Sequence, residues 1–266
     1  MPSRKVRADE LVVQQGLAES RSKAKALIVA GDVRSGDRLI QKPAEMLDVD
    51  LPLELRAKLP FVSRGGLKLD HALTEFEIDV TGAVAADLGA STGGFTDVLL
   101  QRGARRVYAI DVGYGQLDYR LRSDERVVVM ERVNARYLEA LPEPAGFVCV
   151  DVSFISLEHI LPVAERLLEP DGNLVTLIKP QFEAGREAVG RGGVVRDDRT
   201  RKAVVEHVVD LAAQQRFALQ GLTTSPITGP AGNVEYLAWF RRDAVASSGA
   251  VLIERLFRRK ETNQHA

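Results

Sequence analysis

From residue 83 onward, short apolar runs alternate with longer stretches of helical periodicity. Apolar runs separated by helices are typical of parallel strands joined by crossover helices, so this part of the chain is predicted to form a mostly parallel, doubly wound α/β sheet. We expect strands at 84–89, 107–112, 127–132, 146–151, 173–179, 218–227 and 235–241, and helices near 93–102, 156–168 and 197–215.

The first 42 residues differ in character, because they hold nine lysines and arginines against five acids in a chain whose net charge is −1. Two short helices are expected there, the first capped by Asp9 and the second running from a Ser20 cap to Ala30. A strand, a tight turn and a second strand follow at 33–39. This basic module is expected to dock a polyanion, although a solvated charged surface or a protein-docking unit would carry the same charges.

The same module resembles the S4 RNA-binding domain. The resemblance rests on the strings Asp9-Glu10-Leu11-Val12, Gly16-Leu17, Ser20-Arg21-Ser22-Lys23-Ala24, Leu27-Ile28 and Gly31-Asp32-Val33. It implies a small α+β domain that binds RNA through basic side chains. Our candidates for RNA contact are Arg4, Arg21, Lys23, Lys25, Arg34, Arg38 and, beyond the module, Arg64.

A glycine-rich loop follows the first expected strand of the sheet. Glycines at such a turn let a ligand approach the backbone, at the strand end where α/β sheets bind ligands. The dinucleotide fingerprint would need glycine at position 91, where this chain has serine. The loop instead looks like the acid-led loop of methyltransferases, which implies cofactor contacts from Asp87, Gly89, Ser91, Gly93 and Gly94.

Two further positions are expected beside the cofactor. Asp111 ends the second expected strand roughly 20 residues on, where a carboxylate can accept hydrogen bonds from both ribose hydroxyls of an adenosine group. By the same resemblance, Asn134 after the third strand lies beside the adenine. The cofactor implied is S-adenosylmethionine.

Four ionisable residues are expected to converge over the sheet, since carboxyl ends of parallel strands share one edge and an antiparallel last strand begins there. They are Lys68, Asp151, Lys179 and Glu235. In order, they resemble the Lys-Asp-Lys-Glu tetrad of the FtsJ-like ribose methyltransferases, which makes them the candidate catalytic residues. Asp151 is also a candidate cofactor contact.

The strings around the tetrad resemble the TlyA family of ribosomal RNA cytidine 2′-O-methyltransferases, also labelled haemolysin A. They are Ser63-Arg64-Gly65-Gly66, Gly89 to Thr96, Asp111 to Leu117, Ser153-Phe154-Ile155-Ser156-Leu157, Lys179-Pro180-Gln181-Phe182-Glu183 and Gly232-Asn233-Val234-Glu235-Tyr236. The resemblance implies a class I Rossmann-like methyltransferase acting on RNA of ribosomal subunits, with Lys179 as leading candidate for the base. A lysine acts as a base only where a neighbouring cation and a dry site favour its neutral form.

Two other function classes stay open beside the enzyme: a membrane-active haemolysin, and an RNA-binding or ribosome-assembly factor without catalysis. No apolar run approaches the roughly 20 residues of a membrane span. The single Cys149 excludes an internal disulfide and a cysteine-based zinc site, and it is typical of a reducing compartment, so a cytoplasmic protein is expected. The four histidines show no paired spacing, so no metal is expected.

The domain boundaries follow from these patterns. We place the S4-type domain at 1–58, a linker at 59–63 around Pro60, the methyltransferase domain at 64–246 and a C-terminal extension at 247–266. The loop from Gly185 to Gly193, with Arg186 and Arg191, is interpreted as a mobile basic loop beside Lys179 that grips RNA or is a plain connection.

Overall fold

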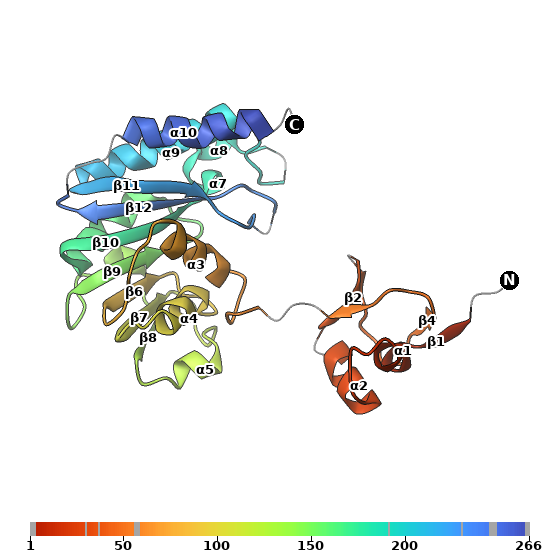
Figure 1. Ribbon diagram of the computed structural model, residues 1–266. Helices are drawn as coiled ribbons and strands as arrows, with labels where there is room; N and C mark the ends of the chain where they lie inside the picture. Colours follow the sequence, from red (N-terminus) through yellow and green to blue (C-terminus); the bar gives the residue numbers. More distant parts are fainter. Residues whose placement is uncertain are drawn as a thin grey trace. The chain divides into compact units, whose positions relative to one another are not determined.

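The computed structural model describes residues 4–29, 31–36, 38–55, 59–190, 192–229, 231–244 and 249–263. The chain forms two compact units, Met1–Pro60 and Phe61–Ala266 (Figure 1). The division falls inside the segment where the linker is expected. The finer domain boundaries stay a prediction.

The N-terminal unit holds two helices and two small antiparallel sheets. The helices are α1 (Ala8–Gln14) and α2 (Arg21–Val29), and β1 (Lys5–Arg7) pairs with β4 (Met46–Asp48). The second sheet has the order β3-β2-β5, formed by β3 (Arg38–Leu39), β2 (Val33–Ser35) and β5 (Glu54–Leu55). Leu11, Ile28, Val33 and Leu47 meet in its apolar core.

Asp9 does not cap α1, so that expectation is wrong. The helix begins at Ala8 with Arg7 as its N-cap residue, and the Asp9 carboxylate is fully buried. It accepts hydrogen bonds from Arg7 at 3.0 Å and from Arg21 at 3.3 Å, and the Arg7 bond holds the pKa of Asp9 below its usual range. The Ser20 cap is confirmed, because the Lys23 backbone N–H donates to Ser20 Oγ at 3.3 Å. Ala30, the expected end of α2, lies outside the described residues.

The C-terminal unit is built on a seven-stranded sheet of order β11-β12-β10-β9-β6-β7-β8. The pairs from β10 to β8 are parallel, and β12 runs antiparallel to both β10 and β11. The mostly parallel sheet with an antiparallel last strand is therefore confirmed. Its strands are β6 (Val84–Leu88), β7 (Arg106–Asp111), β8 (Val127–Glu131), β9 (Ala145–Val150), β10 (Leu168–Ile178), β11 (Phe217–Thr224) and β12 (Tyr236–Arg242).

Helices cover both faces of this sheet (Figure 1). Along β7, Tyr108 and Ile110 enter one apolar cluster while Val107 and Ala109 enter the other. Strands buried on both faces are apolar throughout, which is why the sequence predicts them well. The first cluster includes α6 (Leu161–Leu167), α9 (Asp198–Gln214) and α10 (Gly249–Asn263), and the second includes α3 (Gly66–Glu75) and α4 (Gly94–Gln101).

The helices and strands depart from expectation at four places. The helix expected at 156–168 splits into the 3₁₀ turn η2 (Leu157–His159) and α6, whose second residue, Pro162, has no N–H to continue an earlier turn. The strand β10 is expected to begin at residue 173 but begins at Leu168. Its register against β9 shifts between Leu168 and Asn173. The helices α3 and α10 are not predicted by the sequence pattern. The remaining short elements are α5 (Tyr119–Arg122), η1 (Ala135–Tyr137), α7 (Pro180–Glu183) and α8 (Gly185–Ala188).

Candidate active site

The glycine-rich loop between β6 and α4 packs tightly against the end of β9. A Cβ on Gly89, whose φ is +90°, would lie 2.7 Å from the backbone oxygen of Asp151. A Cβ on Gly94 would lie 2.8 Å from the backbone nitrogen of Gly66, at the start of α3. Glycine is therefore required at both positions, and the loop brings the ends of β6, β9 and α3 together.

Asp111, the last residue of β7, is tied to the same loop. Its Oδ2 accepts a hydrogen bond from the Ser91 backbone N–H at 2.9 Å, and its Oδ1 accepts one from Gly113 at 2.6 Å. Each carboxylate oxygen has a second lone pair available for a ligand. Asp111 thus holds the loop in place and lines the cavity beside it.

That cavity has a volume of about 390 Å³ and runs from the glycine-rich loop to the ends of β7, β8 and β9. Ile110, Val133 and Ala135 give it an apolar wall, and Asn134 also lines it. The Asn134 side-chain oxygen accepts from the Arg136 backbone N–H at 3.0 Å and so caps η1.

Asp87 lies in β6, just before the glycine-rich loop, and it lines none of the cavities around that loop. Its carboxylate is fully buried, and Oδ2 accepts a hydrogen bond from Thr96 Oγ1 at 2.7 Å. Within the described residues Oδ1 has no hydrogen-bond partner. Burial raises the pKa of Asp87 to about 7. Gly93 faces Leu117 and Leu121 rather than a cavity.

The four candidate catalytic residues come together as two ion pairs. Lys68 Nζ on α3 lies 2.6 Å from Glu235 Oε2, just before β12. Lys179 Nζ, just after β10, lies 2.5 Å from Asp151 Oδ1, just after β9. All four line one cavity of about 570 Å³, together with Gly89 and Ser91 of the loop. The lysines and Glu235 are buried, so solvent screens these charges weakly.

Lys179 makes two further hydrogen bonds. Its Nζ donates to the Val152 carbonyl oxygen and to Ser153 Oγ, each at 2.9 Å. The ring of Phe182 lies 5.8 Å from the same nitrogen. With the Asp151 ion pair, these contacts surround the Lys179 ammonium group with oxygen atoms.

The structure adds aromatic and polar residues to which the sequence assigned no role. Phe154 has a φ of +64°, is 91% exposed and packs its ring 5.0 Å from that of Phe182 at the cavity mouth. Gln181 Nε2 lies 3.5 Å from Glu235 Oε1. The strings that contain these residues carried the family resemblance, but neither periodicity nor charge distinguishes them.

Asn233 holds a glycine-containing segment against the cavity. Its buried side chain donates from Nδ2 to the Gly193 carbonyl oxygen at 2.8 Å and accepts at Oδ1 from the Val195 backbone N–H at 3.0 Å. Gly192 and Gly193 line the 570 Å³ cavity. The Gly193 end of the expected loop is therefore fastened, whereas Arg191 and the side chain of Arg186 lie outside the described residues.

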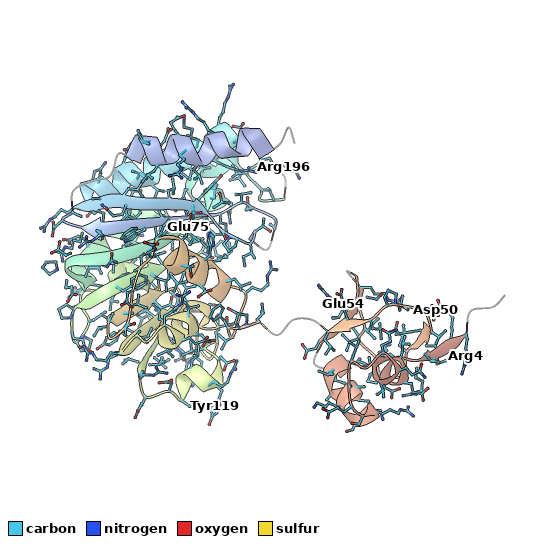
Figure 2. The ribbon with its side chains drawn as sticks, in the orientation of Figure 1. Arg4, Asp50, Glu54, Glu75, Tyr119 and Arg196 are labelled. Atoms are coloured by element: carbon cyan, nitrogen blue, oxygen red, sulfur yellow. The ribbon has the colours of Figure 1, made fainter. Side chains whose placement is uncertain are left out.

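Most candidate RNA contacts of the N-terminal unit already face acids. Arg21 pairs with Asp9 and Glu10, while the partners of the others are Glu19 for Lys23, Glu54 for Arg34 and Glu45 for Arg38. For Arg4 and Lys25, the described residues offer no ion-pair partner. In the view of Figure 2, Arg4 and Glu54, the partner of Arg34, lie at opposite ends of this unit. Arg64 is exposed in the C-terminal unit, just before α3.

Comparisons with known proteins agree with this geometry. The model of the FtsJ-like methyltransferase family matches residues 61–242, and that of the S4 domain matches residues 6–51. The chain is 46% identical over 243 residues to "16S/23S rRNA (cytidine-2'-O)-methyltransferase TlyA" of Mycobacterium tuberculosis (strain ATCC 25618 / H37Rv), covering 90% of this chain and 91% of that protein. It is 44% identical to "Hemolysin A" of Brachyspira hyodysenteriae, covering 88% and 99%.

A solved structure gives the same result. A protein from Streptococcus thermophilus whose name carries the word hemolysin is 42% identical and superposes with a TM-score of 0.76, covering 98% of this chain and 99% of that one. The sheet, the ion-paired tetrad and both family matches lead to one assignment. The chain belongs to the FtsJ-like methyltransferase family, and within it to the TlyA group, whose catalytic domain here follows an S4 domain.

Proposed function

We propose that this methyltransferase transfers a methyl group from S-adenosylmethionine to the ribose 2′-hydroxyl of a cytidine in ribosomal RNA. One observation carries the proposal: Lys68–Glu235 and Lys179–Asp151 form two ion pairs in one cavity beside the glycine-rich loop. Four side chains from separate segments converge there on a site large enough for a nucleotide.

The 390 Å³ cavity suits the adenosine part of S-adenosylmethionine. It offers apolar walls for a base and the Asp111 carboxylate for ribose hydroxyls, and Gly89 leaves the backbone open to close approach. When bound, S-adenosylmethionine supplies a methyl group on a positively charged sulfur. Gly89, Ser91 and Asp151 line both cavities, so the two open on each other along the loop.

The remaining chemistry falls to the lysines. A ribose hydroxyl is a poor nucleophile until its oxygen is oriented and its proton is accepted by a base. Lys179 lines the 570 Å³ cavity beside Asp151, which lines both cavities, and the neutral amine of Lys179 can accept that proton at Nζ. Lys68 is a second cation of the same cavity, and the carboxylates of Asp151 and Glu235 fix both ammonium groups in position. Orientation of the reacting atoms can itself supply several kcal/mol.

Ribosomal RNA is the substrate we favour. The Mycobacterium tuberculosis relative is named for methylation of cytidine in 16S and 23S rRNA. The S4 domain supplies an RNA-binding unit ahead of the catalytic domain. We extend both properties to this chain, with RNA in ribosomal subunits as its partner and the cytoplasm as its place of action.

The hemolysin name shared by two relatives does not alter this choice. Within the described residues, no helix combines the length and the apolar character that crossing a membrane requires. A non-catalytic assembly factor would not need these ion pairs around a cavity, whereas a methyltransferase uses them. Burying a charged group is costly unless it is paired, so the buried Lys68, Lys179 and Glu235 favour catalysis.

The test is a methyl-transfer assay on ribosomal subunits from cells that lack the gene. Wild-type protein should move labelled methyl groups from S-adenosylmethionine into RNA and not into ribosomal protein. Lys179→Ala should bind S-adenosylmethionine normally and slow the transfer by roughly 10²–10⁴-fold. The matched control is Lys202→Ala, a lysine of α9 that pairs with Glu254 away from both cavities. Equal rates for the two variants would remove Lys179 from the reaction.

A further inference from the structure

The contacts of Lys179 fit its charged form. Its Nζ donates hydrogen bonds to the Val152 carbonyl oxygen and to Ser153 Oγ, each at 2.9 Å, and lies 2.5 Å from Asp151 Oδ1 in an ion pair. A base needs a free lone pair, and an ammonium group has none. Lys179 must therefore lose a proton before it can take one from a substrate hydroxyl.

Of the two hydrogen-bonded partners, only Ser153 can pass a proton on. A peptide carbonyl oxygen accepts a hydrogen bond and has no proton to give, whereas a hydroxyl both accepts and donates. Ser153 can take a proton from Nζ while its own proton leaves, and it can then rotate and donate to the neutral amine. No such reversal is open to the Val152 carbonyl oxygen.

Ser153 also lies between the buried amine and solvent. Lys179 is only 7% exposed, whereas Ser153 belongs to the exposed residues. Ser153 lines the 570 Å³ cavity together with Lys179, and it also lines the neighbouring cavities of about 390 and 470 Å³. A proton that reaches Ser153 Oγ can pass directly to water.

The other groups around Lys179 offer no comparable route. Lys68 and Glu235 face it across the cavity and are paired with each other at 2.6 Å. From α7, Phe182 presents only its ring. Glu183 of the same helix accepts from Ser156 Oγ at 2.8 Å and from the Leu157 N–H at 3.0 Å, away from Nζ. Among the described residues, Ser153 is the one hydroxyl bonded to Lys179.

We propose that Ser153 is the relay through which Lys179 exchanges its proton with solvent in each catalytic cycle. The Lys179 Nζ–H bond breaks as Ser153 Oγ accepts the proton, and the original Ser153 proton passes to a water molecule. The products are a neutral amine, an intact hydroxyl and a hydronium ion. The amine then takes the ribose proton while the ribose oxygen bonds to the methyl carbon and the carbon–sulfur bond breaks. This role rests on the proposed function, in which Lys179 is the base.

The direct test measures how fast the Lys179 Nζ protons exchange with water, by NMR of protein labelled with ¹⁵N-lysine and free of methyl donor and RNA. Ser153→Ala should slow this exchange by at least about tenfold, because no hydroxyl is then left to pass the proton from Nζ to water. Ser153→Thr, which keeps a hydroxyl, should restore it. The matched control is Ser156→Ala, which removes a hydroxyl of the same loop that bonds Glu183 instead.

Activity gives a second readout. Methyl transfer by Ser153→Ala should be slowed by about 10- to 100-fold near neutral pH. The defect should shrink as pH rises, because the amine then loses its proton to solvent base without the relay. Added imidazole should partly restore the variant and leave wild type unchanged. S-adenosylmethionine affinity should stay constant.

Unchanged Nζ exchange in Ser153→Ala would overturn the relay, and so would a rate defect that is equal at every pH. These outcomes can be distinguished from a failure of the proposed methyltransferase function. If slowed exchange in Ser153→Ala accompanies wild-type protein that methylates no RNA, the relay stands and the substrate assignment fails.

Discussion

Lys179 and Asp151 directly follow two neighbouring parallel strands, and their side chains meet at 2.5 Å at the carboxyl edge of the sheet. The parallel pairing of β9 and β10 ends both strands at the same edge, so an acid after one meets a lysine after the other. The antiparallel strand β12 begins at that edge, where Glu235 meets Lys68. The topology of the sheet therefore assembles the site from segments far apart in the chain.

Asp111→Ala should weaken S-adenosylmethionine binding by about 1.5–3 kcal/mol, because hydrogen bonds to a charged group are lost. The backbone bonds from Ser91 and Gly113 disappear as well, so the loop also loosens. Asp111→Asn, which keeps one acceptor oxygen, should lose less. Titration calorimetry measures both, with Asp118→Ala on α5 as the control. An Asp111→Ala affinity equal to that of wild type would remove this residue from the cofactor site.

Asp87 should make stability depend on pH. Burial raises its pKa from 3.8 to about 7, so between these values the folded state holds more protons than the unfolded state. The free energy of unfolding should therefore fall as pH rises through this range, by at most about 1.4 kcal/mol per pH unit. Asp87→Asn should remove this part of the slope.

Denaturant unfolding at several pH values measures that difference. Asp118→Asn is the control, since hydrogen bonding to Arg120 lowers the pKa of Asp118 and confines its own effect to more acidic pH. If the free energy of unfolding of Asp87→Asn depends on pH as steeply as that of wild type, the pKa of Asp87 is not raised in the folded protein.

The sheet and the tetrad could be predicted because their signals are local. Strands buried on both faces are continuous apolar runs, and Asp111, Asp151 and Lys179 stand where those runs end. Ser153 and Asn233 had no such signal, since their roles depend on partners placed by tertiary structure. The Asn233 side chain, for example, bonds Gly193, which is distant in sequence.

In the N-terminal unit, local sequence signals were present but misleading, because tertiary contacts change the roles of the residues that carry them. Asp9 stands where a helix cap is common, and Arg21 stands on an apparently basic helix face. Their ion pair makes both residues part of one network around the buried Asp9 carboxylate, which charge counting does not reveal. The local pattern was correct for Ser20, whose cap needs only its own helix.

Asn233→Ala should release the segment from Gly192 to Val195. Two hydrogen bonds of a buried amide are lost, so backbone amide exchange should rise there and the free energy of unfolding should fall by about 1–3 kcal/mol. Hydrogen exchange followed by mass spectrometry resolves the segment. Asn173→Ala, which removes a bond to Trp239 inside the sheet, should destabilise the chain without this local effect. Identical exchange profiles for both variants would show that Asn233 does not fasten the segment.

Substitutions of Arg21 and Lys25 should have different effects, the first on stability and the second on RNA binding. Arg21→Ala leaves buried Asp9 with one guanidinium partner instead of two, so the N-terminal unit should lose about 1–3 kcal/mol of stability. Lys25→Ala should leave stability unchanged, weaken RNA binding and reduce the salt dependence of log affinity by about one unit. Thermal unfolding and RNA titrations at several salt concentrations test both variants. A wild-type salt slope for Lys25→Ala would make Lys25 an ordinary solvated residue.

The position of the transferred methyl group tests the account most directly. Ribosomal RNA from gene-deficient cells is methylated by the purified protein, digested to nucleosides and analysed by mass spectrometry against standards. The two-lysine, two-acid site predicts 2′-O-methylcytidine, and Lys179→Ala should reduce its yield in proportion to its slower rate. A methyl group on the cytosine base, or on a nucleoside other than cytidine, would contradict the assignment.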